Sequence, residues 1–201
     1  AAEYNDKGEV VGPETSYFRS GVIAALNNYC YGQLNGESVS YFSNGSKQSV
    51  TSYVNSDKHG YHQLYYKHGQ TEEEGWYQDD KMEGTWLNYN ELGDLTTSTV
   101  YFDNNLHGIR TEYYPNGKVY NETIYNSGWI EEFIQYDTTG KVINHREFPN
   151  ASGKQVVLNL NGKTYSESSY YNGDLHGELK FYFYDGRVNT VQYYKHGIQD
   201  S

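Results

Sequence analysis

Residues 101–117 read YFDNNLHGIRTEYYPNG, and residues 170–186 read YYNGDLHGELKFYFYDG. Both stretches carry Leu-His-Gly after a polar turn, follow it with an aromatic cluster and end on a turn glycine. A frame of this length that returns along a chain is typical of repeat proteins, in which each copy forms one supersecondary unit. The period of this frame therefore decides the fold.

Columns of glycine and tyrosine keep a step of 24 residues through the first half of the chain, as from Gly45 to Gly69. The step then shortens, and the frame returns near the end. We interpret the chain as one repeat array over residues 1–201, with repeats at 5–28, 29–52, 53–76, 77–100, 101–124, 125–147, 148–169 and 170–193 and a partial repeat at 194–201. The positions with an expected structural role are Gly36, Tyr41, Gly45, Gly60, Tyr65, Gly69, Gly84, Tyr89, Gly93, Gly108, Tyr113, Gly117, Gly177, Tyr182 and Gly186.

Each repeat has the pattern of a β-hairpin. Aromatic residues precede Asn-Gly or Asp-Gly, as in YFSNG (41–45), and these dipeptides favour two-residue turns because both residues tolerate positive φ. The second connection, such as NSDKHG (55–60), is longer and polar, and no segment shows a long apolar stripe at helical spacing. The sequence predicts an all-β fold: a single-layer, elongated antiparallel β-meander of about eight hairpin repeats of 22–24 residues, twisted into a ribbon.

The composition excludes several classes of function. The formal net charge of -11 argues against nucleic acid as the main partner, because neutralising phosphates requires stripes of Lys and Arg. No apolar run approaches the length of a transmembrane helix, so no transmembrane segment is predicted. Cys30 is the only cysteine, which rules out an intrachain disulfide and a cysteine-based metal cage.

His59, His107 and His176 occupy the same position in their repeats, just before a turn glycine. We interpret them as turn residues whose rings cover neighbouring aromatics; the alternative is a pH-sensitive contact to a partner. Repeats that lie two apart cannot bring two such rings to one ion, so we predict no metal site. No nucleophile–base arrangement or phosphate-binding loop is present, and we predict no catalytic residues, no cofactor and no enzyme activity.

The frame departs most clearly from its average in two places, the acidic segment 72–94 and the shortened repeats at 125–169. In the first, an acidic patch could steer and hold a basic partner, and tryptophan is favoured at interface hot spots. The alternative is that the charges keep an exposed sheet soluble while the indoles pack on it. The candidate partner-binding residues are Glu72, Glu73, Glu74, Trp76, Asp79, Asp80, Glu83 and Trp86.

The stretches DNNLHGIRTEYYPNGKV (103–119), NGDLHGELKFYFYDGRV (172–188) and YGQLNGESVSYFSNGS (31–46) resemble the MORN repeat. More closely they are similar to its bacterial variant in the YwqK-type antitoxin family. The resemblance covers essentially the whole chain and is weakest over residues 125–169. It implies a single-layer sheet of hairpins that binds other proteins, and it brings no catalytic residues with it.

Two hypotheses for function follow. The first is a non-enzymatic protein-binding module, an antitoxin or immunity protein that covers a partner protein such as a basic toxin. The second is a structural or envelope-associated scaffold without a toxin partner. The chain starts at Ala1 rather than Met, which favours an exported or envelope protein of a bacterium over a cytoplasmic one.

Overall fold

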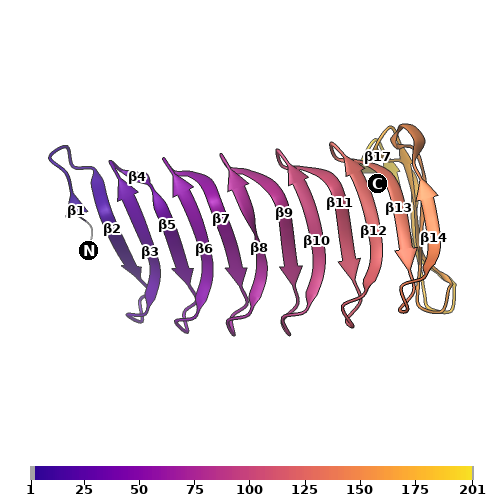
Figure 1. The fold of residues 1–201 in the computed structure, drawn as a ribbon, viewed down its shortest axis with the longest axis horizontal. Coiled ribbons are helices and arrows are strands. Elements are labelled where there is room, and N and C mark those ends of the chain that lie inside the picture. The colour runs from indigo at the N-terminus through magenta and orange to yellow at the C-terminus, as the bar shows by residue number, and fades with distance from the viewer. Residues whose placement is uncertain (1–2, 201) are drawn as a thin grey trace. The chain divides into compact units, whose positions relative to one another are not determined.

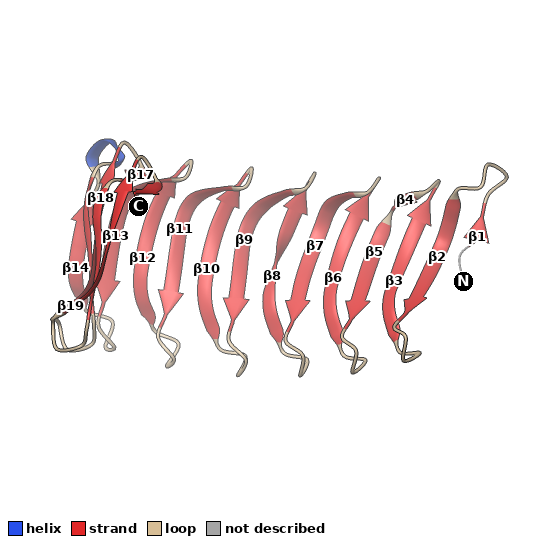
Figure 2. Cartoon of the chain, turned by 180° about the vertical axis from the view of Figure 1, so that it is seen from behind, coloured by secondary structure: helices blue, strands red, loops and turns tan. Residues whose placement is uncertain are grey.

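The computed structural model describes residues 3–200, in which antiparallel strands are joined by tight turns (Figures 1 and 2). The chain forms two compact units, Ala1–Asn104 and Asn105–Ser201. The described residues form strands and one 3-10 turn, and they contain no helix long and apolar enough to cross a membrane.

The first unit consists of strands that pair in chain order, each antiparallel to the one before it. β4 and β5 are two parts of one strand, because both pair with β3. The strands are β1 (Glu3–Tyr4), β2 (Val10–Tyr17), β3 (Ile23–Cys30), β4 (Gln33–Leu34), β5 (Gly36–Tyr41), β6 (Lys47–Val54), β7 (Asp57–Tyr65), β8 (Thr71–Gln78), β9 (Lys81–Tyr89) and β10 (Leu95–Phe102).

The second unit begins in the same way, with β11 (Asn105–Tyr113), β12 (Val119–Asn126), β13 (Trp129–Tyr136) and β14 (Val142–Glu147) paired in chain order. The 3-10 turn η1 (Pro149–Ala151), blue in Figure 2, then leads into a separate sheet. That second sheet contains β15 (Gly153–Leu158), β16 (Thr164–Tyr171), β17 (Asp174–Leu175), β18 (Gly177–Tyr182), β19 (Val188–Lys195) and β20 (Ile198–Asp200).

The fold is thus the all-β antiparallel meander that the repeat period predicts, with the second sheet as an addition. The division of the meander into one array with the repeat boundaries given above stays a prediction.

The structure reverses the predicted lengths of the two kinds of turn: the polar connections are the short turns, and the Asn-Gly connections are the longer ones. The polar connections are the two-residue turns, since both central residues have positive φ, as in Asp79 (51°) and Asp80 (64°). At Asn-Gly only the glycine has positive φ, as in Gly45 (87°), whose N–H donates to the Phe42 carbonyl at 2.8 Å. The prediction of two-residue Asn-Gly turns is therefore wrong. A longer loop with glycine in the left-handed region closes these hairpins, and the strand register shifts beside it.

The other glycine column lies within strands. Gly60 has a φ of 110°, and a Cβ there would lie 3.0 Å from the Ser52 Cβ. The register between β6 and β7 shifts at this point, so the glycine sits in a β-bulge that a side chain would strain. The glycines of the two Leu-His-Gly stretches, Gly108 and Gly177, also have positive φ, 89° and 87°, which favours glycine at this position.

Successive repeats are also joined through their turns. The Tyr66 hydroxyl donates to the Tyr89 carbonyl at 2.8 Å, and the Tyr114 hydroxyl donates to the Tyr136 carbonyl at the same distance. At the opposite ends of the strands, the Asp80 N–H donates to the Lys58 carbonyl at 2.9 Å. Each repeat therefore supplies hydrogen-bond partners to the next one, which accounts for tyrosine in the aromatic cluster.

The second unit contains an apolar core between its two sheets. Ile130, Phe133 and Phe148 are buried against one another, and Tyr125, Val157 and Tyr170 pack around them. β15, the edge strand of the second sheet, meets side chains of the first. Gln135 is fully buried, and its amide donates to the Leu158 carbonyl at 2.6 Å and accepts from the Leu158 N–H at 2.9 Å.

Asn144 continues this contact by donating to the Val156 carbonyl. Together the two amides occupy backbone groups of β15 that would otherwise lack strand partners at a buried edge. Side-chain amides therefore take the place of a neighbouring strand at this edge.

Replacing Gln135 by Ala should destabilise the second unit, because it leaves both backbone groups of Leu158 buried without partners. The expected loss in free energy of unfolding is about 2–4 kcal/mol, measured by urea denaturation. Gln199 lies on the exposed strand β20, and Gln199→Ala should change stability by less than about 0.5 kcal/mol. Equal effects of the two changes would contradict the role given to Gln135.

Candidate functional site

The acidic segment forms β8, β9 and the turn between them, and strand alternation divides its side chains between two faces of the sheet. Cross-strand pairing places Gln63, Glu74 and Leu87 in one row, which defines the Glu74 face. The opposite face carries Trp86 paired with Thr99, and we call it the Trp86 face. The residues that are contiguous in the sequence do not form one patch.

The Trp86 face holds an aromatic cluster around an indole that is only 1% exposed. The ring centroid of Trp86 lies 4.9 Å from Tyr77 and 6.4 Å from Tyr101, both in edge-to-face geometry. Gly75 lies beneath the indole, since a Cβ at this position would be 2.2 Å from a ring carbon of Trp86. Trp86 was a candidate for partner contact, but its burial leaves no side-chain surface to offer, and it packs the sheet instead.

His62 completes this cluster, with its ring centroid 5.7 Å from Trp86 and its Nδ1 2.8 Å from the Thr51 hydroxyl. Burial, with a smaller contribution from the Lys58 ammonium, lowers the pKa of His62 from 6.5 to about 4. The ring is therefore neutral near pH 7 and serves as a packing element with one polar partner.

The Glu74 face carries a carboxylate held by neutral donors. Oε2 of Glu74 accepts from the Tyr61 hydroxyl at 2.5 Å and from the Gln63 amide at 3.3 Å, and Oε1 accepts from the Tyr89 hydroxyl at 2.8 Å. Burial and then the bond to Glu74 raise the pKa of Tyr61, and the same causes raise that of Tyr89 to about 12. These hydroxyls stay protonated, so they fix the carboxylate without neutralising its charge.

Two aromatic side chains border this carboxylate. Tyr61 and Trp76 are cross-strand partners, and they are 38% and 51% exposed. Glu83 pairs with Trp76 from the next strand. The Glu74 face thus combines exposed aromatic surface with fixed negative charge.

The second unit has a glutamate at the repeat position of Glu74, so the two surroundings can be compared. Glu122 stands 48 residues after Glu74 and accepts a 2.7 Å hydrogen bond from the Tyr136 hydroxyl. The positions equivalent to Tyr61 and Trp76 there are Ile109 and Ile124, again paired across the strands. The carboxylate recurs, whereas the aromatic pair does not.

The remaining acidic candidates lie at or near the turns, where several bridge repeats. The Asp79 carboxylate lies 3.0 Å from Nδ1 of His59. The Asp80 carboxylate accepts a hydrogen bond from the Lys58 N–H at 2.8 Å. Glu83 accepts from the Asp103 N–H at 3.1 Å. These carboxylates therefore have structural roles at the ends of the strands.

The last two candidates differ in their surroundings. Glu73 accepts from the Asn88 amide at 2.9 Å on the Trp86 face, whereas Glu72 is exposed near the start of β8. The sequence pattern proposed Glu74 and Trp76 as partner-binding candidates and Tyr89 only as a structural position, and it named neither Tyr61 nor Gln63. The departure of position 61 from its column, which holds Thr85 and Ile109 in other repeats, was the signal available.

The recurring histidines contact the turn of the following repeat. The Nδ1 of His107 accepts from the Ser127 N–H at 3.3 Å, and the Nδ1 of His176 lies 3.5 Å from the His196 N–H. Residues 3–200 contain no group of three or more His, Cys, Asp or Glu side chains able to hold a metal ion.

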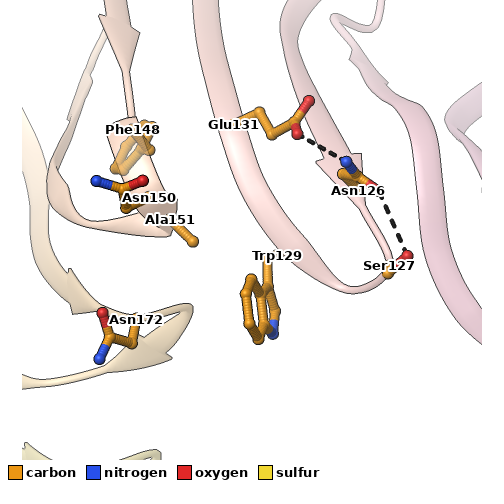
Figure 3. Close-up of a pocket in the computed structure, with 8 residues that line it drawn as sticks. All are labelled: Asn126, Ser127, Trp129, Glu131, Phe148, Asn150, Ala151 and Asn172. Carbon is orange, nitrogen blue, oxygen red and sulfur yellow. Dashed lines mark hydrogen bonds between the residues drawn. The ribbon is translucent and has the colours of Figure 1, made fainter.

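The second departure from the frame, at 125–169, contains an open hollow of about 790 Å³ in the second unit (Figure 3). Trp129 projects into it from β13 and is 56% exposed. The hollow is lined by Asn126, Ser127, Trp129, Glu131, Phe148, Asn150, Ala151 and Asn172, and we call it the Trp129 hollow.

Comparison with known families finds a MORN repeat variant at residues 34–55 and 106–130. The first match runs from the end of β4 to the turn after β6, and the second from β11 into β13. These two segments are therefore similar to the MORN repeat variant. None of the curated proteins matches the chain.

Gly75→Ala should destabilise the first unit by about 1–3 kcal/mol, because the added methyl overlaps the Trp86 indole. Chemical denaturation of the single and double variants measures this effect. Trp86→Phe removes one ring of the indole, so the double variant should lose less stability than the sum of the two single variants. Strict additivity would contradict the close contact.

His62 should make stability depend on pH. Its folded pKa lies below the unfolded value of 6.5, so its contribution is complete above pH 6.5, declines as the pH falls and is lost below about 4. Relative to His62→Gln, which keeps a partner for Thr51, the wild type should lose about 2–3 kcal/mol between pH 7.5 and 4. Urea midpoints of both proteins test this, and parallel pH profiles would show that His62 is not responsible.

Proposed function

We propose that the chain is a protein-binding module that holds a basic partner protein on its Glu74 face. The observation that supports this most directly is the Glu74 carboxylate, fixed by neutral donors beside two exposed aromatic rings. Such a surface offers stacking to an Arg side chain and a charge-assisted hydrogen bond to its guanidinium.

The electrostatics of the whole chain favour the same class of partner. A net charge of -11 attracts a basic protein from a distance, and the fixed carboxylate gives the attraction a local target. Trp76 and Tyr61 can supply the desolvated contact area that hot spots require. The turn carboxylates of Asp79 and Asp80 add to the field at the edge of this surface.

The finer proposal is that the partner is a toxin and that the chain acts as an antitoxin or immunity protein. Binding would cover the toxin's active surface, so the mechanism is occlusion and requires no chemistry by this chain. The resemblance to the YwqK-type antitoxin family and the acidic, aromatic surface support this proposal.

The alternative proposal is a structural or envelope-associated scaffold without a toxin partner. The fully exposed edge strand β20 favours it, since an unpaired edge can add a strand from another molecule. Light scattering at increasing concentration separates the two proposals, because strand addition predicts oligomers and occlusion predicts a stable monomer without partner.

The product of the reading frame adjacent to this gene is the first partner to test. Titration calorimetry should detect a complex whose affinity falls as salt rises. Glu74→Gln should weaken it by about tenfold, or about 1.4 kcal/mol, and Trp76→Ala by at least as much. Glu122→Gln is the matched control, because it removes the same charge from a site where Ile109 and Ile124 replace the Tyr61–Trp76 pair.

If Glu122→Gln weakens the complex as much as Glu74→Gln, only the overall charge matters and the Glu74 face is not the interface. If Glu74→Gln and Trp76→Ala both bind the partner with the affinity and salt dependence of the wild type, the proposed surface is wrong.

A further inference from the structure

The Trp129 hollow exists because the bonding between successive turns is broken there. In the regular pattern a turn N–H donates to the preceding repeat, as Gly128 does to Leu106 at 2.7 Å and Gly173 does to Ala151 at 2.8 Å. The Ala151 N–H instead donates to the Phe148 carbonyl of its own turn at 2.9 Å. The turn at η1 therefore closes on itself and leaves space beside Trp129.

Trp129 is held in this space with one side of its indole against backbone. A Cβ at Gly173 would lie 2.7 Å from a ring carbon of Trp129, so only glycine lets the indole approach so closely. The rest of the side chain faces the open hollow (Figure 3). An aromatic surface that is both anchored and exposed suits stacking with a ligand.

Three asparagines line the same space from different turns. Asn126 donates to Glu131 at 2.9 Å and its oxygen lies 3.3 Å from the Ser127 hydroxyl, so one N–H and one lone pair of this amide are left for other partners. Asn150 and Asn172 sit at turn positions with φ of 51° and 49°, which fixes the backbone from which their amides project.

The lining also indicates which ligands do not fit. None of the residues that line the hollow is basic, which disfavours phosphates and other anions. Phe148 is only 3% exposed, so Trp129 provides the one large aromatic surface, and a cage for a quaternary ammonium requires several. The amides and Glu131 make the space too polar for a purely apolar ligand.

We propose that the Trp129 hollow binds one ring of a neutral saccharide. The C–H face of a pyranose is apolar and flat enough to pack on the indole, while its hydroxyls both donate and accept. Amide side chains match that dual character, because each carries an N–H donor beside a carbonyl acceptor. A volume of about 790 Å³ accommodates a sugar ring with its linked neighbours.

This site is independent of the Glu74 face, which lies in the other compact unit. Binding is tested on the full chain with three probes, chitotetraose, cellotetraose and maltotetraose, each at up to about 10 mM because an open hollow binds small ligands weakly. Tryptophan fluorescence and titration calorimetry should both detect binding of at least one of these saccharides. Choline chloride serves as the cationic probe.

Trp129→Ala should weaken saccharide binding at least tenfold, and Asn126→Ala should weaken it about three- to tenfold. Asn126 has no positive φ, so its replacement by Ala introduces no backbone strain. Asn126→Ala therefore still tests the site if Trp129→Ala does not fold. Trp76→Ala is the matched control: it removes an indole of similar exposure elsewhere and should change saccharide affinity by less than twofold.

Three results would overturn the proposal. They are the absence of binding of all three saccharides, binding that Trp129→Ala and Asn126→Ala both leave unchanged in folded protein, and binding of choline in preference to the saccharides. Failure of the partner-binding experiment on the Glu74 face would leave this test unaffected.

Discussion

The first unit depends on lateral hydrogen bonding between neighbouring strands, because its described residues form one sheet with no second layer over either face. Each strand must therefore obtain its stability from the strands beside it, through backbone pairing and cross-strand side-chain contacts. This explains the abundance of tyrosine. Its ring covers neighbouring residues on a thin sheet, and its hydroxyl reaches a carbonyl of the next repeat, as Tyr66 does.

The same constraint gives the two faces of β8 and β9 different surroundings. Trp86 is buried on one face because Gly75 leaves room for its indole, and His62 and Tyr77 close around it. With that face filled, the opposite face is free to carry exposed aromatics and a fixed carboxylate. A thin sheet can therefore be rigid on one side and available for binding on the other.

The second unit differs because the regular series of hairpin repeats ends within it. Where the repeats shorten, the strands no longer continue side by side, and a second sheet packs against the first over Ile130, Phe133 and Phe148. Gln135 and Asn144 occupy the edge of β15 with side-chain amides. The irregular turn at η1 follows from the same break, and so does the Trp129 hollow.

The sequence by itself determined the hairpin repeat, its antiparallel pairing and the two places where the frame changes, because period and turn glycines act locally. It did not determine which turns are the tight ones, since that depends on how backbone bulges fit the twist of paired strands. Nor did it separate Trp86 from Trp76, which alternate onto opposite faces only once the register of β8 and β9 is known. Tertiary structure alone decided that the strands from β15 to β20 form a second sheet, because Gln135 meets β15 through contacts distant in sequence.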